Sequence, residues 1–304
     1  MITPRYVGRR LALALAQVAA VASAVFLLSD LLPGDAAVII AGDDPDPERI
    51  AQIRQALGLD RPLSERFTDW LGGLLRGDLG HSLVSDRPVS AILGEALGPT
   101  LLLASATLAL LLPLAAVLGV AAALREGGRF DKAFTAIAVG LYAVPEFALA
   151  IVFITALSGI LPVTALGGLT PAAMVPPVAV MLARPLCSLS RLVRAGMIGA
   201  LHAGYTAHPA RLGVPARRVR YLHALPNAVT PAVQQLARTV DWLLGGVIIV
   251  EAVFVVPGLG TVLADAVADR DLPVLQGLAL VFAATTVLAN LTADFAAFRL
   301  APRA

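Results

Sequence analysis

Residues 98–124 read GPTLLLASATLALLLPLAAVLGVAAAL and contain no Asp, Glu, Lys, Arg or His. A bilayer core about 30 Å thick is crossed by about 20 apolar residues in helical form, because a helix satisfies every backbone polar group within the segment. This segment is longer than that minimum, and none of its side chains carries a charge that would resist transfer into lipid. We therefore predict that it is a membrane-spanning helix.

The composition of the whole chain agrees with this assignment. The 304 residues are 58% hydrophobic and 14% charged, whereas soluble domains are about 45–50% apolar and about 25% charged. The formal net charge of +2 gives no reason to expect a nucleic-acid partner. Cys187 is the only cysteine, so an internal disulfide is excluded, and its apolar surroundings favour a packed thiol. The sequence predicts an integral membrane protein.

Five further apolar segments accompany this one, which predicts an all-α membrane protein with six transmembrane helices. The first of them follows Arg9 and Arg10 and has the basic flank and apolar body of a secretory signal. Because it is long enough to span and other spans follow it, we interpret it as an uncleaved signal-anchor. The predicted spans lie near residues 10–31, 98–124, 133–157, 171–193, 228–252 and 274–298.

Basic residues predict the orientation of these spans, because they concentrate in cytoplasmic loops. The 125–132 connection has three Lys or Arg residues, the 158–170 connection has none, and the 251–273 connection holds four acids against Arg270. The alternation predicts that both termini are cytoplasmic and that residues 32–96 lie outside.

The outer segment contains two predicted amphipathic helices. In the first, Asp46 is the predicted N-cap, Pro47 the first helical residue and Gly58 the stop signal. The second includes Phe67 and Trp70, which we expect to lie against the membrane surface or the helix bundle.

A basic segment separates the fourth and fifth predicted spans. Residues 204–229 contain Arg211, Arg217, Arg218 and Arg220 and no acidic residue. On charge alone, these arginines set the orientation and contact lipid phosphates. The connection is nevertheless longer than two spans require, and a structured loop of this size usually contacts a partner.

Glycine and proline residues predict how this segment folds. Gly213 is expected to end one short helix, and Pro215 to start a second helix as its first residue. Pro226 is expected to end that second helix before Asn227. The prediction is a pair of short helices lying across a cytoplasmic loop.

The motifs in and around this segment resemble a known family. Tyr205 and Gly213, followed by RRVRYLHALPNAVTP at 217–231, are similar to the cytoplasmic signature of binding-protein-dependent ABC transporter permeases. Three further stretches resemble the dipeptide, oligopeptide and nickel branch of that family. They are LLPGD at 31–35, LGLDRPLSERFTDWLGGLLRGDLGHS at 57–82, and GGVIIVEAVFVVPGLG at 245–260 with RDLPVLQG at 270–277.

The resemblance implies a type I ABC importer permease with a MetI-like bundle in the inner membrane of a bacterial cell. It divides the chain into residues 1–96, with the first transmembrane helix and an extracytoplasmic loop, and residues 97–304, a five-helix permease core with a cytoplasmic coupling loop at 195–227. In the family this loop forms a coupling helix that docks into the ATPase subunit. The implied coupling residues are Tyr205, His208, Ala210, Arg211, Gly213, Arg217 and Arg218.

The resemblance also implies the partners of the chain. They are a second homologous permease subunit, two cytoplasmic ATP-binding subunits, an extracytoplasmic solute-binding protein and membrane lipid, with no nucleic acid. The chain has no ATP-binding loop of its own, because its single lysine, Lys132, follows no glycine-rich frame. We therefore expect ATP and Mg²⁺ to be bound by the partner subunits, and no cofactor, metal or catalytic residue in this chain.

The chain departs from the family pattern between Tyr205 and Gly213, where it reads TAHPARL with Pro209 inside. A proline is tolerated in the first turn of a helix but not in its interior. We therefore predict that the coupling helix begins late, near His208 as its cap.

Ionisable residues within the predicted spans mark a candidate translocation path, because charges at membrane depth normally face the bundle interior or a water-filled cavity. Glu146 is expected to face the conduit or to pair with Arg184 across the bundle. Arg238 and Asp241 are three positions apart and are expected to neutralise each other on one helical face. In the family, the segment after PGLG at 257–260 helps to form the external gate. The path and gate candidates are Glu146, Arg238, Asp241, Glu251, Pro257, Gly258 and Gly260.

Two other classes of protein are alternatives. A secondary ion-coupled transporter would use intramembrane carboxylates such as Glu146 and Asp241, and would normally have internal repeats with corresponding broken helices, which we do not find. An intramembrane enzyme would need a catalytic pair at one depth, and no predicted span offers a recognisable one. Dipeptide, oligopeptide, nickel, metal chelate and glutathione importers share the implied scaffold, so the sequence leaves the cargo open.

Overall fold

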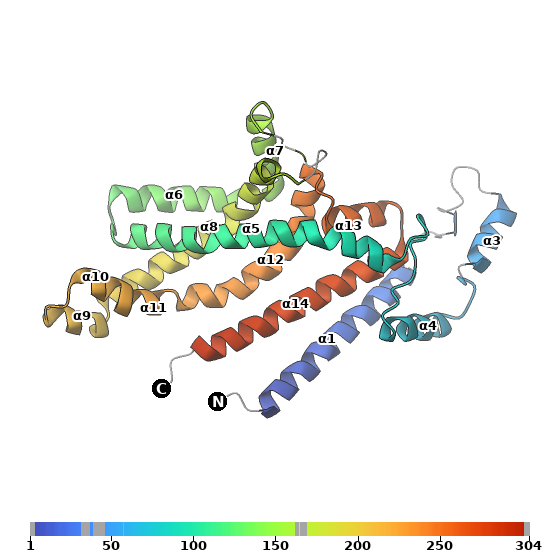
Figure 1. Cartoon of the computed structure of the whole chain (residues 1–304), viewed down its shortest axis with the longest axis horizontal. Helices are drawn as coiled ribbons and strands as arrows, with labels where there is room; N and C mark the ends of the chain where they lie inside the picture. The colour runs from blue at the N-terminus through green and yellow to red at the C-terminus, as the bar shows by residue number, and fades with distance from the viewer. Residues whose placement is uncertain are drawn as a thin grey trace. The chain divides into compact units, whose positions relative to one another are not determined.

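The chain folds into α-helices joined by short turns in a computed structural model (Figure 1). The structure describes residues 4–31, 37–38, 46–56, 58–161, 164 and 169–300. Within these residues the only β pairing is an isolated bridge between His81 and Pro88. The helices are α1 (Pro4–Leu31), α3 (Pro47–Ala56), α4 (Leu63–Leu75), α5 (Val89–Ala123), α6 (Arg129–Ala143), α7 (Glu146–Leu157), α8 (Pro171–His202), α9 (Gly204–Arg211), α10 (Ala216–Arg218), the π-helix η1 (Val219–Ala224), α11 (Leu225–Ala228), α12 (Thr230–Phe254), α13 (Leu259–Ala268) and α14 (Leu272–Leu300).

By length and composition, four described helical segments are suited to cross a membrane, and two bent helix pairs raise that number to six. The continuous segments are Val7–Leu28, Val89–Ala123, Pro171–His202 and Leu272–Thr292, and the bent pairs are Arg129–Ala143 with Glu146–Leu157 and Val247–Phe254 with Leu259–Ala268. The all-α fold class is therefore confirmed. Four of the six predicted spans correspond to the continuous segments, and the third predicted span corresponds to the first bent pair. The second bent pair begins at Val247 and so overlaps only the end of the fifth predicted span, 228–252.

The third predicted span is broken where α6 meets α7, with a bend of 104°. Val144 and Pro145 there have extended backbone conformations, with ψ of 127° and 146°. A proline disfavours helical geometry in the residue before it and lacks the N–H that would continue the helix. The break puts Glu146 in the first turn of α7.

The chain forms two compact units, which we describe separately: residues 1–100 with 257–288, and residues 101–256 with 289–304. In the first unit, the buried apolar core comes from the start of α5, from α13 and from α14. Thr100 Oγ1 accepts a hydrogen bond of 2.9 Å from the N–H of Leu259 and so satisfies the first turn of α13. The core residues are Val89, Leu93, Ala96, Leu259, Ala266, Val274 and Leu278.

Asp271 holds the turn before α5 in the same unit. Its buried carboxylate accepts hydrogen bonds from the hydroxyl of Ser82 and, at 3.1 Å, from the N–H of Leu83. A buried carboxylate needs such donors, because an unpaired charge away from water is costly. The turn is therefore fixed to the start of α14 by contacts between residues distant in sequence.

The two predicted amphipathic helices are confirmed as α3 and α4. The Asp46 side chain accepts a hydrogen bond of 3.1 Å from the N–H of Glu48, and Gly58 ends the first helix with φ of +62°. On α4, the rings of Phe67 and Trp70 lie 5.3 Å and 5.2 Å from the ring of Phe26 on α1. The second amphipathic helix therefore packs against the first span.

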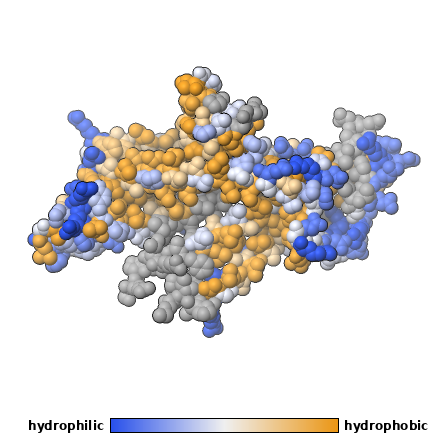
Figure 2. Space-filling view, viewed as in Figure 1, coloured by the Kyte–Doolittle hydropathy of each residue, from blue (hydrophilic) through white to orange (hydrophobic). Residues whose placement is uncertain are grey.

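Helix α8 is the centre of the second unit, where it contacts α6, α7, α11 and α12. Thr170 caps it by accepting a hydrogen bond of 3.2 Å from the N–H of Ala173, and Pro171 occupies the first helical position, which needs no N–H. Figure 2 shows hydrophobic side chains over α5 and α6, and strongly hydrophilic side chains beside hydrophobic ones around α9 and α10. This distribution suits lipid around the long helices and water around the short ones.

The segment after α8 differs from its prediction in three respects. Helix α9 begins at Gly204, so the predicted start near His208 is wrong, and Pro209 lies inside the helix. Pro215 directly precedes α10 instead of being its first residue. Pro226 does not end the second helix but lies in the first turn of α11, after the π-helix η1. Pro226 is thereby placed in the first turn of a helix, where a proline is tolerated.

Candidate functional site

The predicted coupling residues lie close together on α9 and α10 and in the turn between them. Tyr205, His208 and Arg211 are exposed on α9, and Arg217 and Arg218 are exposed on α10. Ala210 belongs to α9, but its side chain lies outside the described part of the structure. The result is an exposed basic surface that also carries apolar groups.

Gly213 makes the turn between these helices possible. Its φ is +78°, a left-handed conformation that costs other residues energy because of their Cβ atom. The following N–H, of Val214, donates a hydrogen bond of 3.1 Å to the carbonyl oxygen of Pro209 and closes the end of α9. The predicted helix-ending role of Gly213 is confirmed. Leu212 beside it is 71% exposed.

Residues 204–228, called the coupling segment after their predicted role, are anchored to the end of α8. The buried hydroxyl of Thr206 lies 2.7 Å from the carbonyl oxygens of both Ala200 and Ala203. Gly196 on α8 approaches Ala228 on α11 so closely that a Cβ atom would stand 2.2 Å from the Ala228 carbonyl oxygen. The short helices are therefore packed and hydrogen-bonded against the end of α8.

A buried ion pair ties α6 to the same part of α8, and the sequence did not reveal it. The carboxylate of Asp131, 3% exposed, accepts hydrogen bonds from the Arg194 guanidinium, including one of 2.7 Å from Nη2, and one of 2.9 Å from the N–H of Gly127. Each carboxylate oxygen thus has a donor, as a buried charge requires.

A second ion pair lies where α7 begins. Arg184 Nη1 on α8 donates a hydrogen bond of 2.9 Å to Glu146 Oε1, and the Arg184 guanidinium carbon stands 4.9 Å from the centre of the Tyr142 ring. The predicted pairing of Glu146 with Arg184 is confirmed. It joins α7 to α8 across the break between α6 and α7.

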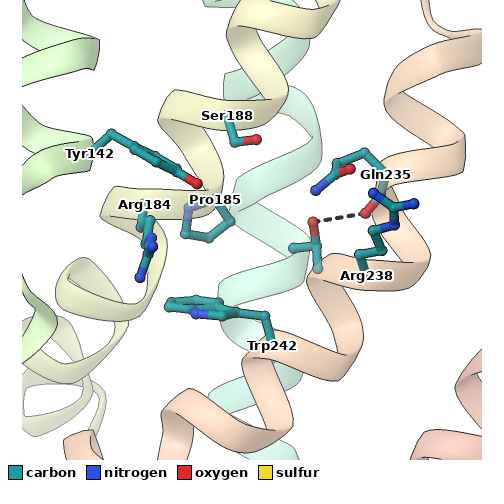
Figure 3. A pocket seen from close by; sticks show the side chains of 8 residues that line it. Tyr142, Arg184, Pro185, Ser188, Gln235, Arg238 and Trp242 are labelled. Atoms are coloured by element: carbon teal, nitrogen blue, oxygen red, sulfur yellow. Dashed lines mark hydrogen bonds between the residues drawn. The ribbon is translucent and has the colours of Figure 1, made fainter.

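A cavity of about 200 Å³ adjoins this pair, between α6, α8 and α12. Figure 3 shows Tyr142 and Arg184 on one side of it and Gln235, Arg238 and Trp242 on the other. The dashed line there joins the Thr239 hydroxyl to the Gln235 carbonyl oxygen at 3.1 Å. The predicted partner of Arg238, Asp241, has its side chain outside the described part of the structure. Arg238 therefore lines a polar cavity, and its pairing with Asp241 stays a prediction.

A second cavity, of about 550 Å³, continues the first one toward the coupling segment. The two share Tyr142, Ser188 and Gln235. The second is also lined by Thr135, Arg191, Leu192, Arg194 and Ala195. Sequence reasoning missed the polar lining residues Tyr142, Ser188 and Gln235. Only Ser188 had a signal in the sequence: it follows Arg184 by four positions and precedes Arg191 by three, which places these three residues on one face of a helix.

The predicted gate residues belong to both units of the chain, and each is described within its own unit. Glu251 is fully buried on α12 in one unit, and its carbonyl oxygen accepts a hydrogen bond of 2.9 Å from the N–H of Val256. In the other unit, Gly258 precedes α13 and Gly260 lies in its first turn. Pro257 is exposed just before them. Among the described residues, no group of three His, Cys, Asp or Glu side chains is arranged to hold a metal ion.

Comparison with known proteins gives a consistent result over the whole chain. Residues 115–304 match the family described as binding-protein-dependent transport system inner membrane component, and residues 3–104 match the family of its N-terminal part. A probable peptide ABC transporter permease of Sinorhizobium fredii is 32% identical over 98% of both chains. A putative peptide transport system permease of Brucella abortus is 32% identical over 94% of both. A glutathione transport system permease of Pectobacterium atrosepticum is 36% identical over 89% of both.

Proposed function

Since this chain belongs to the family of binding-protein-dependent transport system inner membrane components, it is a multi-pass permease subunit of an ABC importer, and we propose that it forms half of a translocation path for peptides or related small solutes. The names of the related proteins, which refer to peptides and to glutathione, support this cargo class. The cargo that we propose for such a path includes dipeptides, oligopeptides, nickel and metal chelates.

The observation that carries the mechanism is the attachment of an exposed basic segment to the end of α8 through Thr206 and Gly196. We propose that the residues of α9 and α10 dock into two cytoplasmic ATP-binding subunits, which bind ATP and Mg²⁺. When those subunits close on ATP, the segment acts as a lever on α8. Because α8 contacts α6, α7 and α12, its movement changes access to the cavities between these helices.

The remaining subunits of the importer follow from the same proposal. A second homologous permease subunit completes the path, and an extracytoplasmic solute-binding protein delivers cargo to the outer face, which includes residues 32–96. Both termini of the chain are then cytoplasmic. Glu146, Arg238 and Asp241 belong to the path, and Glu251, Pro257, Gly258 and Gly260 to its outer gate.

The alternative of a secondary ion-coupled transporter is not supported, since the related proteins are ABC permeases. Glu146, one of the carboxylates that such a carrier would use, is bound by Arg184.

The proposal is tested by expressing the chain with the gene products of its operon and purifying it through an affinity tag. We expect ATP-binding subunits and a second permease to co-purify. Proteoliposomes containing the complex and the solute-binding protein should take up peptides only with ATP inside the compartment that faces α9. Peptide uptake by this chain alone, without any ATPase, would refute the proposal.

A further inference from the structure

Polar residues form a continuous stripe along the two joined cavities of the second unit. On α8, Arg184, Ser188 and Arg191 follow one another at four and three positions, so they share one helical face. On α12, Gln235, Arg238, Thr239 and Trp242 repeat at three, four and seven positions and line the facing wall. Tyr142 of α6 closes the side (Figure 3). We call this hollow, lined by Tyr142, Arg184, Ser188, Arg191, Arg194, Gln235, Arg238 and Trp242, the cationic trough.

The charges of the trough are unequal. Its described lining includes four arginines and no acidic residue. Arg184 is bound by Glu146 and Arg194 by Asp131. For Arg191 and Arg238, no carboxylate lies within ion-pair distance among the side chains that the structure describes. Two exposed arginines, Arg191 and Arg238, therefore line the trough.

Charged side chains within the helices of a membrane bundle indicate a functional site. An ionised side chain at membrane depth is costly unless it faces water or an anion, and it then marks the route of a solute. A guanidinium group binds a carboxylate with two parallel hydrogen bonds, which gives both affinity and orientation. The lining fits an anion that carries a carboxylate and has further polar groups.

We propose that the cationic trough binds the carboxylate of a peptide cargo during its passage, with Arg238 and Arg191 as successive contacts along the path; this rests on the proposed function. The Ser188 hydroxyl and the Gln235 amide supply hydrogen bonds for peptide groups, and Trp242 supplies an apolar surface. The larger cavity, of about 550 Å³, lies within the range of about 300–1,000 Å³ that is usual for small-molecule sites.

An acidic side chain of the second permease subunit would be a different occupant of the trough. The lining favours a solute, because hydroxyl, amide and aromatic groups surround the guanidinium groups, as in pockets that recognise small molecules by a few placed polar groups. Because the two cavities share part of their lining, the trough offers two cationic positions, one after the other along the path. Passage of a solute needs such successive positions, whereas a fixed contact between subunits does not.

The test uses the complete importer, with its solute-binding protein, in proteoliposomes. The variant pair Arg191→Gln with Arg238→Gln removes both of these positive charges, and Arg191→Lys with Arg238→Lys keeps them. Arg129→Gln is the matched control, because Arg129 is exposed in the same unit and lies outside the trough. A mixture of di- to pentapeptides with free C-terminal carboxylates is supplied beside the same peptides as C-terminal amides, and uptake is measured by mass spectrometry.

We expect the glutamine pair to lower uptake of the free-acid peptides about tenfold, the size of effect that loss of a charged hydrogen bond produces. The lysine pair should retain most of the uptake, and the Arg129→Gln control all of it. ATP hydrolysis and the subunit composition of the purified importer should stay at wild-type levels in every variant.

The inference would be overturned if the glutamine pair took up the free-acid peptides as fast as the wild type. It would also be overturned if uptake of the free-acid peptides and of their amides were both measurable and fell equally. Loss of the second permease subunit from the glutamine pair would also overturn it, and would assign the arginines to the contact between subunits. If the assembled wild-type importer hydrolyses ATP but takes up no peptide, the proposed cargo class itself is wrong.

Discussion

The carboxylate of Asp131 shows how much a single side chain contributes to the second unit. It joins α6 to α8 through Arg194 and closes the 124–128 turn through the N–H of Gly127. The partners lie 63 positions apart, and no local pattern in the sequence connects them. The Glu146–Arg184 pair was predicted, because an isolated carboxylate inside a span needs a partner, whereas a charge at the end of a span can also be solvated.

We predict that Asp131→Asn destabilises the protein by about 3 kcal/mol, because it leaves the partly buried Arg194 guanidinium without its counter-charge. The measurement is unfolding of the purified permease by a denaturing detergent. The control is Glu95→Gln, whose ion pair with Arg87 joins side chains that are 67% and 50% exposed, and which should cost less than about 1 kcal/mol. Equal small losses in both variants would contradict a structural role for Asp131.

The helices after α8 show where sequence rules for proline fail. Pro209 lies near the end of α9, shortly before the turn at Gly213. Few backbone hydrogen bonds of the helix therefore depend on this proline. Pro226 follows a π-helical stretch, whose hydrogen bonds skip one residue more than those of an α-helix. The role of Gly213 was predicted correctly, because a left-handed turn favours glycine over other residues. Whether a helix tolerates a proline depends instead on the backbone hydrogen bonds around it.

Gly213→Pro should leave membrane insertion intact but uncouple ATP hydrolysis from uptake. Proline fixes φ near −65°, whereas the turn requires +78°, so α9 and α10 would lose their relative geometry. Uptake and ATP hydrolysis are measured together in proteoliposomes. Gly213→Asn is the control, since asparagine tolerates the left-handed conformation better than most residues and should retain coupled transport. Wild-type uptake by the proline variant would refute the lever.

Close packing between α8 and α11 gives a second prediction for this segment. A Cβ atom at Gly196 would meet the Ala228 carbonyl oxygen at 2.2 Å, whereas nothing lies within 4 Å of a Cβ atom at Gly199, less than one turn later on α8. Gly196→Ala should therefore destabilise the protein by about 1–3 kcal/mol through overpacking. Gly199→Ala should be neutral or stabilising by up to about 1 kcal/mol, because alanine favours helix. Indistinguishable thermal midpoints of the two variants would show that α11 does not pack as described.

For the whole chain, the sequence predicted the class and the number of spans but not which segments associate. Hydrophobic length alone identifies the spans. The first unit joins residues 257–288 to residues 1–100 through contacts such as Ser82 with Asp271, which are 189 positions apart. Local patterns carry no information on such a pairing. The two family matches instead meet between residues 104 and 115, close to the predicted domain boundary at 96, which stays a prediction.

The orientation of the chain is open to a direct test. Val84 and Glu126 are exposed in the turns before and after α5, so they lie at opposite ends of one span. In a Cys187→Ser background, Val84→Cys should react with a membrane-impermeant maleimide in cells whose outer membrane is permeabilised. Glu126→Cys should react only after the inner membrane is opened. The reverse pattern would place the termini outside.

Helix α8 continues through Pro185, which lines the smaller cavity and has no N–H to bond the Met181 carbonyl one turn earlier. A helix is easiest to bend where such a bond is missing, on the side of the ring. A push on α9 is therefore expected to arrive at the trough as a change of angle about Pro185 and not as a shift along the helix axis. The two halves of α8 would then act as the arms of a hinge, with Arg184 and Ser188 on either side of its pivot.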